Sequence, residues 1–175
     1  MLPVTVKADR VALHELTRAS AAELSEGGSG GWQWAPGGPD EGSRFAAAKM
    51  LSGMEAGRHL AGWGAYVVVR AEDGRAIGGI GFHGPPEDGR VEVGYDLAES
   101  VRGHGYATEA LNALTAWALA QPDVQTVYAT TDEDNTPSQR VLDRAGFRRI
   151  GDTPRPINGR EAQHLYEQSN PPATE

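Results

Sequence analysis

Two glycines flank a histidine in the segment Arg102-Gly103-His104-Gly105-Tyr106-Ala107, at the point where a strand-like pattern gives way to a helical one. The first backbone N–H groups of a helix have no internal partner, and the helix dipole places partial positive charge there. Glycine lets a ligand approach the backbone closely, and Arg102 can add a charge-assisted hydrogen bond. The segment therefore indicates an anion site of the kind that binds a pyrophosphate.

The segment differs from the two common phosphate loops. It lacks the Lys-Ser/Thr end of a P-loop and the third glycine of a dinucleotide fingerprint. It also follows the middle of a mostly antiparallel run instead of an N-terminal βαβ unit. Spacing alone leaves two interpretations open, a tight strand-to-helix turn and a phosphate-binding turn. A phosphoryl-transfer enzyme is disfavoured, because the lysine and metal carboxylates it requires are missing.

The elements that must position this turn alternate between strands and helices. Apolar residues with β-branched enrichment or period-2 alternation predict strands, and a 3.6-residue period predicts helices. The predicted strands cover residues 11–17, 65–70, 76–82, 90–97, 124–131, a stretch beginning at 147, and 164–167. The predicted helices run from an N-cap at Ser20 through residue 24, over 41–58, from 107 to about 120, and over 137–145.

Residues 27–39 form a long loop rich in glycine and proline, with Trp32 and Trp34 inside it. Two tryptophans are unusual in a plain linker. They either pack back onto the core or form a wall of the substrate site.

Composition limits the class of protein. The 175 residues suit one domain, expected over residues 1–168, with a frayed tail at 169–175. There is no cysteine, the formal net charge is −8, and the five histidines show no metal-ligand spacing. These features disfavour disulfides, a metal site and general nucleic-acid binding. No membrane-spanning run or signal peptide is evident, so we expect a soluble, cytoplasmic protein with no membrane partner.

A resemblance to a known family narrows these interpretations. Arg102-x-x-Gly105-x-Ala107 matches the Arg/Gln-x-x-Gly-x-Gly/Ala signature of the GNAT superfamily of acyl-CoA N-acyltransferases. The stretch Glu92-Val93-Gly94-Tyr95-Asp96-Leu97, the later Asn135-Thr136-Pro137-Ser138, and Gly146-Phe147 resemble its RimJ/RimL-type branch, which contains ribosomal-protein N-terminal acetyltransferases. The resemblance follows element order from about Val11 to Tyr166, and its specific part is residues 92–147.

The resemblance implies an α/β (α+β) fold with a mixed, mostly antiparallel, twisted sheet that is splayed between its fourth and fifth strands and flanked by helices. It implies acetyl-CoA as co-substrate, with pantetheine in the gap. Backbone groups of Tyr95, Asp96 and Leu97 would pair with pantetheine like another strand. The stretch around the pyrophosphate would consist of Arg102, Gly103, His104, Gly105, Tyr106, Ala107 and Thr108.

Two further residues have both a structural and a functional interpretation. Thr136-Pro137-Ser138-Gln139 fits a capping box with Thr136 as N-cap, so the segment can be explained by helix-start chemistry. The resemblance instead implies a cofactor contact for Asn135. It also places Ser138 near the thioester sulfur, where its hydroxyl could protonate the leaving thiolate.

Glu92 is the candidate general base. An amine acceptor must be neutral to attack a thioester, while a lysine or α-amino group has a pKa of about 10.4 or 8. A carboxylate, or a water that it orders, should therefore collect the proton. Glu92 lies on the polar face of the strand that leads to the expected cofactor, which also makes it a substrate-binding candidate. A salt-bridged strand residue without a chemical role would fit the same pattern.

The chain departs from the related RimI-like branch at two positions. An acidic residue five positions before the asparagine is replaced by Thr130, and a tyrosine seven positions after it is replaced by Leu142. Neither role can be transferred. The base is therefore expected at Glu92 and the acid at Ser138 or water.

The expected function is acetyl transfer from acetyl-CoA to a primary amine, such as a protein N-terminus, by direct attack without a covalent enzyme intermediate. Two alternatives stay open. One is an acetyltransferase for a small-molecule amine or antibiotic, and the other is a non-catalytic acyl-CoA-binding regulatory module. A homodimer is one assembly that the resemblance implies.

Overall fold

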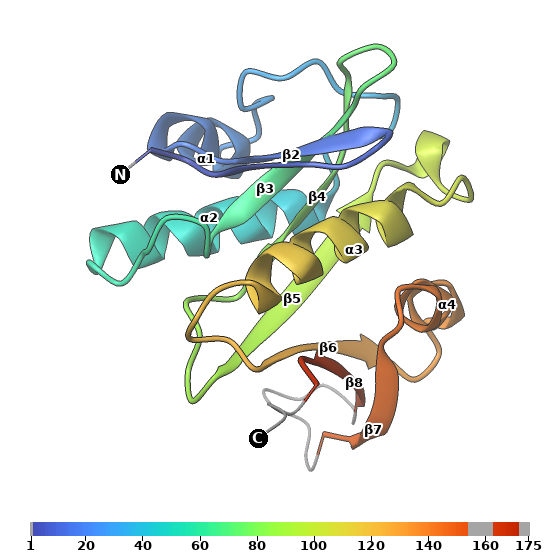
Figure 1. The fold of residues 1–175 in the computed structure, drawn as a ribbon. Coiled ribbons are helices and arrows are strands. Elements are labelled where there is room, and N and C mark those ends of the chain that lie inside the picture. The colour runs from blue at the N-terminus through green and yellow to red at the C-terminus, as the bar shows by residue number, and fades with distance from the viewer. Residues whose placement is uncertain (1, 154–162, 172–175) are drawn as a thin grey trace.

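The computed structural model describes residues 2–153 and 163–171 (Figure 1). The described residues form eight strands, four α-helices and one short 3-10 helix, η1 (Glu99–Val101). The strands are β1 (Thr5–Lys7), β2 (Val11–Glu15), β3 (Ala65–Arg70), β4 (Ala76–Phe82), β5 (Arg90–Leu97), β6 (Thr126–Asp132), β7 (Arg148–Asp152) and β8 (Gln163–Ser169). The α-helices are α1 (Arg18–Ser25), α2 (Glu41–Glu55), α3 (Tyr106–Leu119) and α4 (Thr136–Arg144).

The strands lie in the order β1-β2-β3-β4-β5-β6-β8-β7. Every neighbouring pair is antiparallel except β5 and β6, which run parallel. A parallel pair needs a crossover connection, and α3 supplies it. The expected α/β fold with a mixed, mostly antiparallel sheet is therefore confirmed.

Helices cover both faces of the sheet. Figure 1 shows α3 in front of the central strands and α2 behind them. Strand β3 is buried on both faces, so its side chains alternate between two apolar clusters. Tyr66 and Val68 point into the cluster that includes the buried face of α3, whereas Val67 and Val69 point into the cluster under α1 and α2.

Both predicted N-caps are displaced from their expected positions. Helix α1 begins at Arg18 with Thr17 as its N-cap, because the Thr17 hydroxyl accepts a hydrogen bond from the Ser20 N–H at 3.1 Å. Helix α4 is capped by Asn135 instead of Thr136. In both cases several adjacent residues have side-chain oxygens suited to capping, and the path of the incoming chain selects one of them.

Toward both ends of the chain, the observed strands extend beyond the predicted ones. Strand β1 was missed, because three residues with exposed and half-buried side chains carry no apolar alternation. Strand β8 runs to Ser169, and the Asn170 side-chain amide donates to the Leu119 carbonyl at 2.9 Å. Residues 172–175 of the expected tail lie outside the described residues.

Within the described ranges, no helix has the length and apolar character needed to cross a lipid bilayer.

One buried carboxylate ties the start of the chain to the loop after α2. Glu15, only 6% exposed, ends β2. Its two oxygens accept the Gly62 N–H at 2.8 and 2.9 Å, and one also accepts the Val4 N–H at 2.8 Å. A charge taken from water needs such partners.

We expect Glu15→Ala to lower the free energy of unfolding by about 3 kcal/mol, because two buried N–H groups lose a charged acceptor. Urea denaturation followed by circular dichroism measures this. The exposed Glu72 in the β3–β4 turn provides the control, since Glu72→Ala should change stability by less than about 0.5 kcal/mol. Equal effects for the two variants would contradict the role of Glu15.

Candidate active site

The glycine turn before α3 has left-handed backbone geometry. Gly103 and Gly105 adopt φ angles of +82° and +80°, which strain any residue with a Cβ atom. Gly105 is the N-cap of α3 and has no side chain to satisfy the first N–H groups of the helix. The turn thus exposes the donors that an anion site requires. Phosphate binding itself stays a prediction.

The Arg102 side chain points away from this turn. Its guanidinium donates to the Leu97 carbonyl at 3.0 Å and to the Asp40 carboxylate at 2.9 Å. Asp40 is the N-cap residue of α2. Arg102 therefore connects the end of β5 to the start of α2, and its guanidinium is engaged outside the expected pyrophosphate loop.

Arg10, which the sequence analysis did not single out, braces the turn instead. It precedes β2, yet its side chain donates to Glu109 Oε2 at 2.7 Å and to the His104 carbonyl at 3.0 Å. The guanidinium also lies 4.7 Å from the centre of the Tyr106 ring, within cation–π range. No sequence signal joins residues so far apart along the chain.

The sheet opens between β5 and β6. Residues 90–92 of β5 pair with residues 126–128 of β6, and the parallel ladder ends there. Beyond that point β5 pairs with β4 and β6 pairs with β8, so the two strands diverge. These strands are the fourth and fifth of the sequence-based prediction, so the expected splay lies where it was predicted.

A side-chain contact between β5 and the start of α4 spans this gap. The Tyr95 hydroxyl lies 2.9 Å from Ser138 Oγ and donates to the Ser138 carbonyl at 3.2 Å. Burial raises the pKa of Tyr95 to about 12, against a smaller lowering by Ser138. The phenol is therefore neutral at pH 7 and can act as a hydrogen-bond donor.

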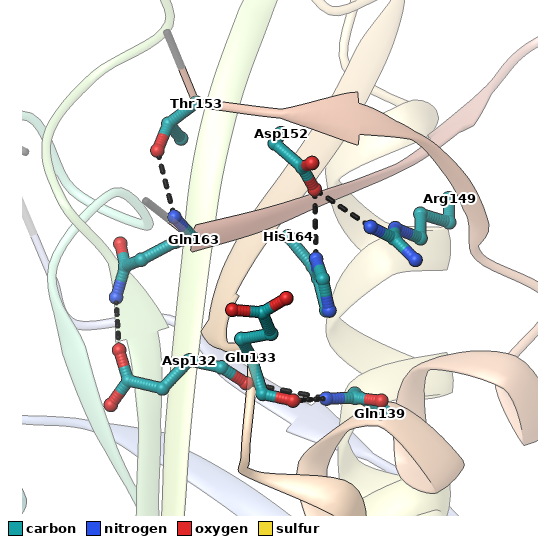
Figure 2. Close-up of polar contacts among 8 residues, drawn as sticks. All are labelled: Asp132, Glu133, Gln139, Arg149, Asp152, Thr153, Gln163 and His164. Atoms are coloured by element: carbon teal, nitrogen blue, oxygen red, sulfur yellow. Dashed lines mark hydrogen bonds and ion pairs between the residues drawn. The ribbon is translucent and has the colours of Figure 1, made fainter. Parts of the chain in front are cut away.

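Asn135 and Ser138 lie at the start of α4. Asn135 Oδ1 accepts the Ser138 N–H at 3.2 Å, which fulfils the capping interpretation with the cap one residue earlier than expected. The turn before Asn135 is held from both sides, as Figure 2 shows. The Gln139 side chain donates to the Asp132 and Glu133 carbonyls, and the Gln163 side chain donates to the Asp132 carboxylate at 2.8 Å.

The strand pair behind this turn is joined by a second polar group, also drawn in Figure 2. Asp152 of β7 binds Arg149 and the ring of His164, each at 2.8 Å. The hydrogen bond from Arg149, followed by that from His164, lowers the pKa of Asp152. The contact between Asp152 and His164 therefore joins β7 to β8.

A cavity of about 1010 Å³ opens on the α2 face of the sheet. Alternation along β5 brings Glu92, Gly94 and Asp96 to this cavity, while Val91 and Val93 are buried in the core. Aromatic groups from other elements complete its apolar walls. They are Phe45, Trp63, Tyr66, Phe82 and Tyr128.

Glu92 is half-buried at one end of this cavity. One carboxylate oxygen accepts the Thr130 hydroxyl at 3.2 Å, and the other lies 3.2 Å from Nδ1 of His83. Burial raises the pKa of Glu92, but the His83 contact, the Thr130 hydrogen bond and the charge of Lys49 outweigh it, so the pKa is lowered overall. Glu92 is thus ionised at neutral pH. Thr130, which replaces an acidic residue of the related branch, contacts the carboxylate directly.

Asp96 occupies a more buried position on the same strand. Its Oδ1 accepts the Ser43 hydroxyl at 2.7 Å and the Gly79 N–H at 2.9 Å. Burial raises the pKa of Asp96 despite the lowering by Ser43 and Gly79. The side chain therefore fixes β5 against α2 and β4.

The two tryptophans of the long loop pack against the core. Trp32 and Trp34 lie against the apolar cluster under α1 and α2, and Trp32 also contacts the His14 ring, with centroids 5.3 Å apart. Among the described residues, neither tryptophan lines the cavity that contains Glu92. Their positions therefore fit the interpretation in which both tryptophans pack onto the core.

Over residues 2–153 and 163–171, no three histidine or carboxylate side chains gather as a metal site would require.

Residues 4–148 match the family model described as an acetyltransferase (GNAT) domain. The chain belongs to the GNAT acetyltransferase family. A GNAT relative from Bacillus subtilis (strain 168), "Uncharacterized N-acetyltransferase YjdG", is 36% identical over 87 residues, which is 49% of this chain and 52% of the relative. The chain thus spans about half the length of the curated relatives it matches.

Solved structures share the GNAT fold over nearly the whole chain. Mycobacterium smegmatis RimJ in complex with CoA-disulfide has a TM-score of 0.69 at 23% identity, covering 95% of this chain and 88% of that one. The ribosomal-protein-S5-alanine acetyltransferase from Vibrio fischeri has a TM-score of 0.68 at 18% identity, covering 98% of this chain and all of that one. Solved RimJ and RimL structures are thus among the neighbours with the same fold, as expected.

We expect Arg10→Ala to speed amide exchange about tenfold in residues 109–112, the first hydrogen-bonded N–H groups of α3, because an ion pair and a cation–π contact together contribute about 1.4 kcal/mol to holding this turn. Hydrogen–deuterium exchange read by mass spectrometry measures this. Arg149 is the matched control, since it has the same 47% exposed side chain and also binds one carboxylate. Exchange at the turn that is equally slow in Arg10→Ala and Arg149→Ala would exclude the brace.

Proposed function

We propose that this chain transfers the acetyl group of acetyl-CoA to a primary amine by direct attack. One observation carries the proposal: the gap between β5 and β6 opens toward the uncapped start of α3, and the polar face of the same β5 strand lines the cavity with Glu92. A thioester held in the gap and an amine held in the cavity would meet at β5.

The open edge of β5 and the glycine turn supply the expected acetyl-CoA contacts. Backbone groups of Tyr95, Asp96 and Leu97 lie where β5 has left β6, so they suit an added strand-like ligand. The stretch from Gly103 to Thr108 would surround the pyrophosphate, and Asn135 would border the pantetheine. The CoA-bound RimJ from M. smegmatis, which has the same fold, supports this assignment.

The residues around the gap suit the proton transfers. The proton lost by the amine goes to the pair formed by Glu92 and His83. A backbone N–H on the open edge of β5 would stabilise the negative charge that develops on the carbonyl oxygen. The Ser138 hydroxyl, in contact with Tyr95, would protonate the departing thiolate.

The acceptor that fits best is the N-terminus of a peptide. The ring of Phe45 is 72% exposed on α2 and borders the cavity, so the entrance is open and apolar. Trp32 and Trp34 do not enclose the cavity, whereas a compact pocket for a small molecule would favour such enclosure. The likeness to the Vibrio fischeri ribosomal-protein-S5-alanine acetyltransferase supports the same choice.

A small-molecule amine is the second candidate, because the cavity of about 1010 Å³ is large enough to hold one.

We also infer a single domain over residues 1–168, since one continuous sheet connects both halves of the chain.

We expect acetyl-CoA at 100 times its Kd to raise Tm by about 5–10 °C, since such binding stabilises a protein by about 2.7 kcal/mol. Differential scanning fluorimetry measures the shift, with ATP and NAD as controls. Thiol release is then followed with alanyl-phenylalanine amide and 2-phenylethylamine as acceptors. A shift without thiol release would favour the acyl-CoA-binding module, and no shift would exclude the proposal.

We expect Ser138→Ala to lower kcat about 100-fold. This loss is at the lower end of the range for general acid catalysis, because a thiolate leaves readily without being protonated. Tyr95→Phe should give a smaller loss, since it leaves the Ser138 hydroxyl in place. Steady-state thiol release measures both variants. Ser25→Ala on α1 is the control, because its hydroxyl bonds only within its own helix. A wild-type kcat in Ser138→Ala would assign the proton to water.

A further inference from the structure

We propose that His83, and not Glu92 itself, takes the proton from the acceptor amine, with Glu92 as its positioning residue. The inference rests on the proposed acetyl transfer. His83 follows β4 directly, and its backbone N–H donates to the Glu92 carbonyl at 3.0 Å, so the two residues are neighbours across the β4–β5 pair. Their side chains meet at 3.2 Å on the cavity side.

The imidazole is held in one orientation. Its Nδ1 faces the Glu92 carboxylate, while its Nε2 lies against Gly94, where an added Cβ would be only 2.9 Å away. Gly94 is therefore the residue that leaves room for the ring. From Glu92 to Gly94 the ring extends toward residues 95–97, the part of β5 that has separated from β6. Nε2 therefore lies beside Gly94, the residue that precedes the part of β5 proposed to border the thioester.

Glu92 is suited to orient a base more than to act as one. Both of its oxygens are engaged, one by Thr130 and one by His83. Its side chain is 23% exposed, against 46% for His83, so the imidazole is the more accessible of the two from the cavity. An ionised carboxylate at Nδ1 holds the proton there and leaves the lone pair on Nε2.

Histidine also has the appropriate basicity. An unperturbed imidazole has a pKa of about 6.5, whereas a glutamate carboxylate has about 4.3, and a base works best near the operating pH. Other charged or titratable groups border the same cavity on the neighbouring elements. They are Glu41 and Lys49 on α2, Arg58 and His59 in the loop after it, Tyr66 on β3, Glu87 before β5, Arg90, Tyr95 and Asp96 on β5, and Tyr128 on β6.

Acetyl transfer at this site takes one proton from the amine and supplies one to the thiolate. The neutral amine attacks the thioester carbonyl carbon, a C–N bond forms and the C–S bond breaks, with the bonding pair leaving on sulfur. One N–H proton of the former amine moves to His83 Nε2, and Glu92 stabilises the imidazolium that results. The departing thiolate gains its proton from water or from Ser138, and in the second case water returns a proton to the serine oxygen. The imidazolium of His83 releases its proton to water, so the enzyme ends each turnover as it began.

The test is the pH profile of kcat/KM, measured by thiol release with alanyl-phenylalanine amide and 2-phenylethylamine. We expect His83→Gln to lower kcat/KM about 100-fold at pH 7. The variant should also lose the inflection of the profile in the pH range where a histidine base gains its proton. Glu92→Gln should keep the inflection but shift it to lower pH, because the imidazolium loses its carboxylate partner. A merely structural Glu92 would not move the inflection. His14→Gln, on β2 beside Trp32, is the histidine control with an unchanged profile.

Two results would overturn the role of His83. One is a wild-type profile in His83→Gln. The other is loss of turnover in Glu92→Gln together with normal turnover in His83→Gln, which would make the carboxylate the base. Acetyl-CoA affinity, measured by calorimetry, should be unchanged in all variants. A wild-type protein that binds no acetyl-CoA would instead contradict the proposed function, so the two failures are distinguishable.

Discussion

The arrangement of the site depends on how few residues join β5 to β6. Only three residues of each strand form the parallel ladder, while residues 93–97 of β5 pair with β4 and all of β6 pairs with β8. Each strand is therefore committed to a different half of the sheet. The backbone groups of β5 that β6 leaves behind form a sheet edge inside the molecule, and such an edge accepts an extended ligand.

Close packing on the α2 face places Glu92 and His83 next to that edge. Glycines of β4 allow this packing: a Cβ at Gly79 would lie 2.5 Å from Ser43 Oγ, and one at Gly81 would lie 2.6 Å from the Gly64 carbonyl. Gly94 of β5 leaves the matching space for His83. The cavity and the gap thus share one strand, with apolar residues facing the core and polar ones facing the cavity.

Much of the fold could be predicted from local patterns. The period-2 alternation of Val91, Val93 and Tyr95 and the helical period after Ala107 fix where β5 ends and α3 begins. The glycines at 103 and 105 indicated a tight strand-to-helix turn, and the structure adds that both have left-handed backbone angles. Strand β1 escaped prediction because three exposed or half-buried residues become a strand only by pairing with β2. The caps were predicted at Ser20 and Thr136 instead of Thr17 and Asn135, because nearby polar residues cap equally well in isolation.

The sequence by itself determined the fold class, the glycine turn at a helix start and the carboxylate on the polar face of β5, because these depend on residues close together in the chain. Tertiary structure alone decided which groups those residues meet. It turned Arg102 toward Asp40, placed Arg10 against the glycine turn, and packed the loop tryptophans on the core. It also brought His83 beside Glu92. Such contacts join separate strands and loops, so their partners are set by sheet register and close packing, which no local pattern encodes.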